Sequence, residues 1–232
     1  MTIAPTSRAD ELAALRQRIA RLERPGLAAA EAGVELVTHP ALAPVLRLRA
    51  GGTYQVDSTT LALLLMAGPS RAGAWSALVG VDDLGAEAAA AWGVELSRTV
   101  VVPEPGEQWL EALAAVIDLA GLVVVRPPLL RGRRAPLAPS VAERLSARLR
   151  ERSAALVVQG EWPRCTARLR LAEVAWHGVG HGEGLLDRRH AVVEVQRGSA
   201  PPVRVRLEGL GDAGLPVGVG RHGATPLRKA AG

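Results

Sequence analysis

The stretch Gly51-Gly-Thr-Tyr-Gln-Val-Asp-Ser-Thr-Thr-Leu-Ala-Leu-Leu-Leu-Met66 decides the fold of this 232-residue chain. An apolar segment, Val45–Arg49, precedes its glycine turn, and an apolar run that opens with two threonines follows it. We therefore predict a strand over Val45–Arg49, a turn at Gly51-Gly52 and a buried helix over Thr59–Met66. A strand, a glycine turn and a helix in this order form the setting of a phosphate-binding loop.

The segment from Gly52 to Thr59 departs from the phosphate-loop pattern G-x-x-x-x-G-K-[ST] at its two most important positions. Gly52 and Thr59 fit, but Asp57 stands in place of the second glycine and Ser58 in place of the lysine. A carboxylate repels phosphate, and the missing lysine removes the cation that would offset the phosphate charge. We therefore expect a degenerate loop and no nucleotide cofactor.

Short apolar segments alternate with helical ones as far as residue 158. The predicted strands are Ala74–Val81, Thr99–Val102, Gly121–Val125 and Ala154–Val158. The predicted helices are a short alanine-rich one that ends near Trp92, then Gly106–Leu119 and Pro139–Arg152. This alternation indicates an α/β fold with a mostly parallel central sheet flanked by helices.

The pattern changes beyond Trp162, where no helical periodicity remains. Cys165–Glu173, His190–Arg197 and Val203–Glu208 alternate apolar and polar residues, which predicts antiparallel strands added at the C-terminal edge of the sheet. From Gly211 onward the chain is rich in glycine and proline without periodicity, so we expect residues 211–232 to form a flexible tail.

The N-terminal segment Asp10–Arg24 carries a narrow apolar stripe, made of Leu12, Leu15, Ile19 and Leu22. This spacing predicts an amphipathic helix that docks on another helix, on a second protomer in self-association, or on its own domain. The chain then divides into residues 1–44, an N-terminal helix and connector, residues 45–210, a single core domain, and the tail.

The composition is that of a globular protein, with 48% hydrophobic and 22% charged residues. The formal net charge is +5, and all but one of the 28 basic residues, Lys229, are arginine. Such a bias is typical of GC-rich coding, so the basic balance permits nucleic-acid binding without requiring it. A single cysteine, Cys165, excludes an intramolecular disulfide, and no apolar run is long enough to span a membrane. We expect a soluble, cytoplasmic protein.

Five segments in order resemble RecA recombinases. Asp57–Leu63 is similar to their Gly-Lys-Thr-Thr-Leu-Ala-Leu, Gly93–Leu96 to their Gly-Val-Asp-Leu, and Pro105–Glu111 to their Thr-Gly-Glu-Gln-Ala-Leu-Glu. Leu122–Val125 falls where the Walker B strand belongs and Ala154–Gln159 where the next core strand does. The resemblance covers about residues 45–208 and implies a RecA-like core.

The resemblance also implies which chemistry is lost. The catalytic glutamate of RecA falls at Val81, with Asp82 and Asp83 adjacent but out of register. The aspartate that directs magnesium falls at Arg126, where a base reverses the charge of the site. The DNA-contacting loop after the fifth strand is reduced to Gly160–Pro163. We therefore expect a degenerate Walker B site, no metal and no ATP hydrolysis.

A RecA-like core with a degenerate phosphate loop in a short chain from a GC-rich source resembles ImuA-prime, the actinobacterial branch of the ImuA family. The resemblance implies a non-catalytic accessory protein of the translesion-synthesis mutasome in the DNA damage (SOS) response. The implied partners are ImuB, bound through the C-terminal part, and indirectly an error-prone C-family polymerase. The alternative is a regulator that caps or inhibits RecA filaments on DNA. Either role would bring the protein to the nucleoid when it acts on DNA.

Two features are candidates for contact with DNA or a partner. Arg131, Arg133 and Arg134 form a basic cluster near the place of RecA's first DNA-binding loop, and Trp162 stands beside the shortened loop. Arginine forks suit phosphate, and an exposed tryptophan suits base stacking or protein docking. A solvated loop in an arginine-rich chain remains the alternative for the cluster.

Overall fold

The computed structural model describes residues 33–130, 132–134, 137–177, 188–208 and 217–222. Its strands are β1 Thr53–Val56, β2 Ser76–Val79, β3 Thr99–Val102, β4 Leu122–Val125, β5 Leu129–Leu130, β6 Arg133–Arg134, β7 Ala155–Gln159, β8 Ala167–His177, β9 Arg188–Gln196, β10 Val203–Glu208 and β11 Val217–His222. Its helices are α2 Thr59–Arg71, α3 Ala86–Ala91, α4 Trp109–Ile117 and α5 Pro139–Glu151, with short 3₁₀ turns at Leu96–Arg98 and Gly106–Gln108.

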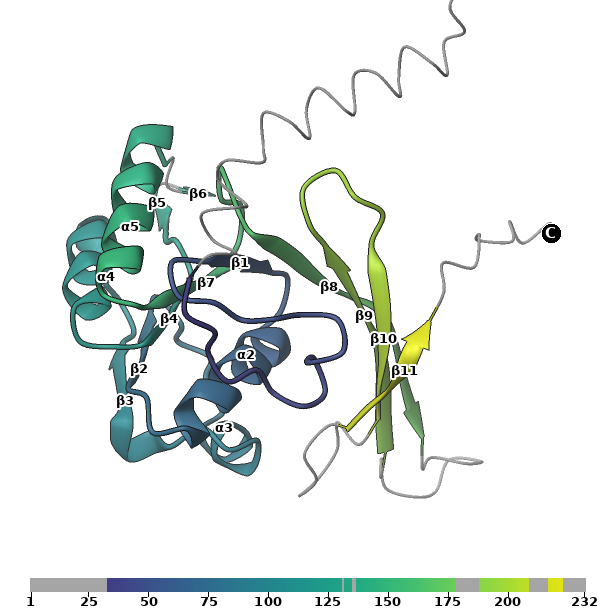
Figure 1. Ribbon diagram of the computed structural model, residues 1–232. Coiled ribbons are helices and arrows are strands. Elements are labelled where there is room, and N and C mark those ends of the chain that lie inside the picture. The colour runs from purple at the N-terminus through teal and green to yellow at the C-terminus, as the bar shows by residue number, and fades with distance from the viewer. Residues whose placement is uncertain (1–32, 131, 135–136, 178–187, 209–216, 223–232) are drawn as a thin grey trace, which may run out of the picture.

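A nine-stranded sheet, in the order β11-β10-β9-β8-β1-β7-β4-β2-β3, forms the centre of the molecule (Figure 1). The neighbouring strands β3, β2, β4, β7, β1 and β8 pair in parallel, in this order. The strands β8, β9, β10 and β11 pair antiparallel. The predicted α/β class, with antiparallel strands at the C-terminal edge, is confirmed. The hairpin of β5 and β6 stands apart from this sheet.

Two apolar cores lie on opposite faces of the sheet. One packs α2 against β1, β7 and β8, and the other packs α4 and α5 against β2, β4 and β7. The strands β4 and β7 are buried along their whole length, so their sequences, Leu-Val-Val-Val and Ala-Leu-Val-Val-Gln, are apolar rather than alternating. These two central strands are therefore covered on both faces.

The first strand differs from the sequence expectation. Val45–Arg49 is not a strand of the sheet, and the position of β1 is taken by Thr53–Val56, after the glycine turn. Within β1, Tyr54 and Val56 are buried on the α2 face while Gln55 lies on the other. The Tyr54 hydroxyl accepts a hydrogen bond from the backbone N–H of Arg49 at 2.8 Å, and burial raises the pKa of this phenol to about 12.

Residues 33–50, which include the end of the predicted connector, pack onto the core. Leu42, Leu46 and Leu48 are almost fully buried in the core on the α2 face. The backbone N–H of Leu36 donates to the carbonyl of Leu48 at 2.9 Å. The compact part of the chain thus begins before residue 45, the boundary that the sequence suggested.

Helix α2 runs through Gly68 and Pro69, although this pair predicts a helix end. A side chain at Gly68 would come within 2.2 Å of the carbonyl oxygen of Val37, so only glycine lets residues 37–39 cross the helix so closely. Pro69 has no backbone N–H, so one hydrogen bond is missing from the last turns of the helix.

Both predicted terminal extensions lie partly or wholly outside the described residues. The expected N-terminal helix, Asp10–Arg24, is outside them. Val217–His222, inside the expected flexible tail, instead forms β11 and pairs with β10. Alternate glycines in Val-Gly-Val-Gly hide the two-residue period of this strand from a reading by composition. In the part of the chain that the structure describes, no helix is long and apolar enough to cross a membrane.

Candidate functional site

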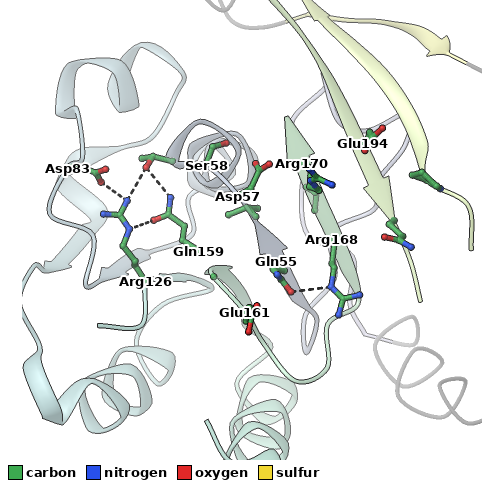
Figure 2. Close-up of a pocket in the computed structure, with 16 residues that line it drawn as sticks. Gln55, Asp57, Ser58, Asp83, Arg126, Gln159, Glu161, Arg168, Arg170 and Glu194 are labelled. Atoms are coloured by element: carbon green, nitrogen blue, oxygen red, sulfur yellow. Dashed lines mark hydrogen bonds and ion pairs between the residues drawn. The ribbon is translucent and has the colours of Figure 1, made fainter. Parts of the chain in front are cut away.

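A hollow of about 920 Å³ lies where the carboxyl ends of the parallel strands meet (Figure 2). One side is formed by residues that follow β1, β2, β4 and β7, including Thr59, Asp83 and Arg126. The other side is formed by polar residues of β8 and β9. Ligands of open α/β sheets bind at this kind of edge, so the hollow is the candidate site.

The guanidinium of Arg126 is the centre of a hydrogen-bonded cluster, which we call the Arg126 cluster. Nη2 donates to Thr59 Oγ1 at 3.1 Å and to Asp83 Oδ1 at 2.7 Å. Nη1 donates to Asp82 Oδ1 at 3.0 Å, and Nε donates to Gln159 Oε1 at 2.9 Å. One side chain thus links the ends of β2, β4 and β7 with the start of α2.

Gln159 completes the cluster from the end of β7. Its amide Nε2 donates to Thr59 Oγ1 at 3.0 Å, so the threonine hydroxyl oxygen accepts from both Gln159 and Arg126. The Gln159 side chain is buried, whereas that of Arg126 is 28% exposed. Two carboxylates face one guanidinium, so the cluster carries a net negative charge, a poor environment for phosphate.

Gly80 lets β2 pass close to Arg126. Its φ is +72°, and a Cβ at this position would lie 2.3 Å from the carbonyl oxygen of Arg126. The backbone N–H of Arg126 in turn donates to the carbonyl of Val79 at 2.9 Å. This close passage brings Asp82 and Asp83 to the guanidinium.

The expected phosphate loop is not a loop. Only Asp57 and Ser58 connect β1 to α2. Ser58 is the N-cap of α2, and its Oγ accepts from the backbone N–H of Leu61 at 3.4 Å. Both carboxylate oxygens of Asp57 accept from the backbone N–H of Leu171 in β8 at 3.2 Å. These two residues satisfy neighbouring backbone groups of the protein itself.

Gly52 does not belong to the site. It precedes β1, at the opposite end of the strand from Ser58, and does not line the hollow. A side chain there would come within 2.8 Å of the Tyr54 ring, so this glycine serves packing. Thr59 and Arg126, by contrast, are hydrogen-bonded to each other in the Arg126 cluster.

The remaining sequence candidates lie elsewhere. Trp162, expected to be an exposed stacking residue, is 4% exposed and packs in the core with α4 and α5, because the chain turns inward after β7. Arg133 is exposed in the hairpin of β5 and β6. The side chain of Arg134 and the whole of Arg131 lie outside what is described.

Sequence reasoning missed Gln159 and the pairing of Asp82 and Asp83 with Arg126. A glutamine at the end of a fully apolar strand was the available signal for the first. For the aspartates, the signal was a pair of acids after β2 together with an arginine at the matching position after β4.

Comparison with known proteins matches the parallel half of the molecule. The family model described as the MT3502 N-terminal domain matches residues 41–164, which end just before β8. A curated relative from Mycobacterium tuberculosis (strain ATCC 25618 / H37Rv), "Uncharacterized protein Rv3395c", is 39% identical over 121 residues. That alignment covers 51% of this chain and 57% of the relative, so less than two thirds of the relative's length is spanned. Since the family model covers more than half of the chain, the protein belongs to the MT3502 N-terminal domain family.

Proposed function

We propose that this protein is a non-catalytic accessory factor of the translesion-synthesis mutasome, with a RecA-like core of the ImuA-prime type, and that it binds ImuB. Through ImuB it would act with an error-prone polymerase in damage-induced mutagenesis, in the cytoplasm and at the nucleoid. The observation that carries the proposal is the Arg126 cluster, because a guanidinium stands among Thr59, Asp82 and Asp83 where an ATPase would need a metal ion.

The convergence of these residues supports the RecA-like part of the proposal. The resemblance assigns Thr59 to a magnesium-binding hydroxyl, Val81 to a catalytic glutamate and Arg126 to a magnesium-directing aspartate. In the fold, Thr59, the residues beside Val81 and Arg126 lie at one edge of the sheet. This meeting of segments that are distant in sequence supports the RecA-like part of the proposal.

The two-residue connection between β1 and α2 supports the non-catalytic part. A phosphate loop wraps several consecutive backbone N–H groups around the phosphates, which needs a longer segment between strand and helix. Here Ser58 caps the helix directly after Asp57. ATP would also have to displace Arg126 from Asp82 and Asp83.

Calorimetry with Mg-ATP and a turnover assay test the non-catalytic part. We expect no heat of binding and no release of phosphate above that of a protein-free control. Micromolar binding that is lost in a Thr59→Ala variant would contradict this part, because it would mean that the threonine serves a nucleotide.

Co-purification tests the partner. We expect tagged full-length protein to retain ImuB and not RecA, whereas retention of RecA alone would favour the filament-regulator alternative. Two truncations locate the contact. Deletion of residues 211–232 also removes β11, so deletion of residues 223–232, which keeps β11, is the matched control. Unchanged ImuB binding in the longer deletion would remove the C-terminal segment from the proposal.

A further inference from the structure

Among the described residues, no helix covers one face of the antiparallel half of the sheet. Helices α4 and α5 pack on β2, β4 and β7, and α2 occupies the opposite face (Figure 1). On the face shared with α5, the strands β8, β9 and β10 present polar side chains. This surface borders the hollow described above.

The polar side chains form two rows across the strands, and we call them together the open face. The register aligns Gln55, Arg168 and Gln196 in one row. It aligns Arg170, Glu194 and Arg204 in the next. The intervening residues, such as Leu169 and Val193, point into the core on the other side.

Two of the three arginines keep guanidinium nitrogens that no other described residue engages. Arg204 is committed to Glu194, with Nε at 2.9 Å and Nη2 at 2.5 Å from the same carboxylate oxygen. Arg168 donates to Gln55 through Nε at 3.2 Å, which leaves its two terminal nitrogens. Arg170 makes no hydrogen bond or ion pair with any other described residue. Both Arg168 and Arg170 are exposed and line the hollow (Figure 2).

We infer that the open face is a docking surface for an acidic peptide segment of a partner protein, held by Arg168 and Arg170. Three arginines against one glutamate give the rows a surplus of positive charge, and two guanidinium forks on one strand can each take a carboxylate through two hydrogen bonds. Gln55 and Gln196 lie in the same row as Arg168, and their side-chain amides can form hydrogen bonds with the amides of a peptide.

The chemistry around the arginines favours a peptide over nucleic acid. The carboxylates of Asp57, Asp83 and Glu161 also line the hollow and would repel a continuous phosphate backbone. The described lining residues include no aromatic ring on which a base could stack. In an acidic peptide the backbone is neutral and each carboxylate sits on a flexible side chain, so the carboxylates can turn toward the arginines and away from the acidic residues of the hollow.

The inference takes its biological meaning from the proposed adaptor role. Its test does not use ImuB, so the two can fail separately. Fluorescence anisotropy would measure binding of labelled hexaglutamate and of a labelled oligothymidine strand to the full chain at low salt. The variant is Arg168→Glu with Arg170→Glu. The control, Arg144→Glu with Arg150→Glu, makes the same change in net charge at two exposed positions of α5.

We expect the full chain to bind hexaglutamate, the open-face variant to bind it at least about 10-fold more weakly, and the control to stay within about 2-fold. Circular dichroism and thermal unfolding establish that each variant is folded, and Arg168→Gln with Arg170→Gln replaces the charge reversal if it is not. Absence of binding by the full chain, or equal loss in both double variants, would overturn the inference. Preference for oligothymidine through the same two arginines would overturn it in favour of a nucleic-acid surface.

Discussion

At the scale of single residues, the side chain of Arg126 links the ends of several strands. Its four partners, Thr59, Asp82, Asp83 and Gln159, come from three separate segments of the chain. The two carboxylates are largely exposed, so each ion pair is partly screened by water and contributes modestly. The buried amide of Gln159 and the hydroxyl of Thr59 hold the guanidinium of Arg126 in position.

Replacing Arg126 with alanine should lower the free energy of unfolding by about 1–3 kcal/mol, because Gln159 loses a donor and two carboxylates are left facing each other. Urea denaturation followed by circular dichroism measures the change. Arg133→Ala, which removes an exposed arginine from the hairpin, should change stability by less than about 0.5 kcal/mol. Equal stability of both variants would mean that the cluster does not hold the strand ends together.

His39 should make the fold sensitive to mild acid. Its side chain is 2% exposed, and burial together with the nearby charge of Arg71 lowers the pKa of this imidazole from 6.5 to about 4. Between these values the unfolded chain binds a proton that the folded chain does not. Stability is therefore full above pH 6.5 and falls toward pH 4, by up to about 3 kcal/mol.

Urea midpoints measured between pH 4 and pH 7.5 check this expectation. The His39→Asn variant keeps an acceptor for the backbone N–H of Ala41, which His39 Nδ1 accepts at 3.2 Å, but cannot titrate. The variant should show a flatter profile over the same range. Identical slopes would assign the acid sensitivity to other groups.

At the scale of elements, the sequence predicted the strands after residue 74 because each is an apolar run between clear turns. Leu122–Val125 and Ala155–Gln159 are buried on both faces, and such segments have few alternatives to a central parallel strand. The first strand was not predictable in the same way. Val45–Arg49 alternates more strongly than Thr53–Val56, but its apolar residues pack onto the core on the α2 face without joining the sheet.

The candidate site, like the strands, was predictable only in part. The meeting of Thr59 and Arg126 follows from their places at the ends of neighbouring elements, which sequence order can suggest. The inward turn of Trp162 could not be read from sequence, because it depends on the space left between α4, α5 and β7. The open face was not predictable either, because the register of β8 and β9 decides which of their side chains lie next to one another.

Introducing the side chains of an ATP site should not create ATP binding. A variant with Ser58→Lys and Arg126→Asp has the lysine and the acid of the RecA pattern, but the connection between β1 and α2 is still two residues long. We expect calorimetry with Mg-ATP to detect no binding, because backbone length limits the phosphate cradle. Binding by this variant would mean that the side chains, and not the length of the connection, limit ATP binding.

At the scale of the whole molecule, the sheet has two halves of different character. The parallel half falls within the family match of residues 41–164, whereas β8 to β11 lie beyond it. The two halves share β1, which pairs with β7 on one side and β8 on the other. The antiparallel half therefore lies beyond the family match and joins the matched half through β1.

Removing residues 211–232 should destabilise the antiparallel half selectively. The deletion takes away β11 and leaves β10 with an unpaired edge. We expect faster amide hydrogen exchange in β10 and β9 and little change in β4 and β7, measured by mass spectrometry. Deletion of residues 223–232 should leave both regions unchanged, and uniform exchange changes would contradict the division into halves.

The central place of β1 also constrains how the chain can fold during its synthesis. Thr53 pairs with Leu156 and Tyr54 pairs with Ala167, so the middle of the sheet cannot close until more than a hundred further residues have left the ribosome. Until then α2 has only part of its apolar surface covered. Sheets with such distant pairings form slowly, and strand edges that are still unpaired are prone to aggregation with other chains. The nascent protein therefore depends on late, C-terminal strands to bury its earliest apolar segments.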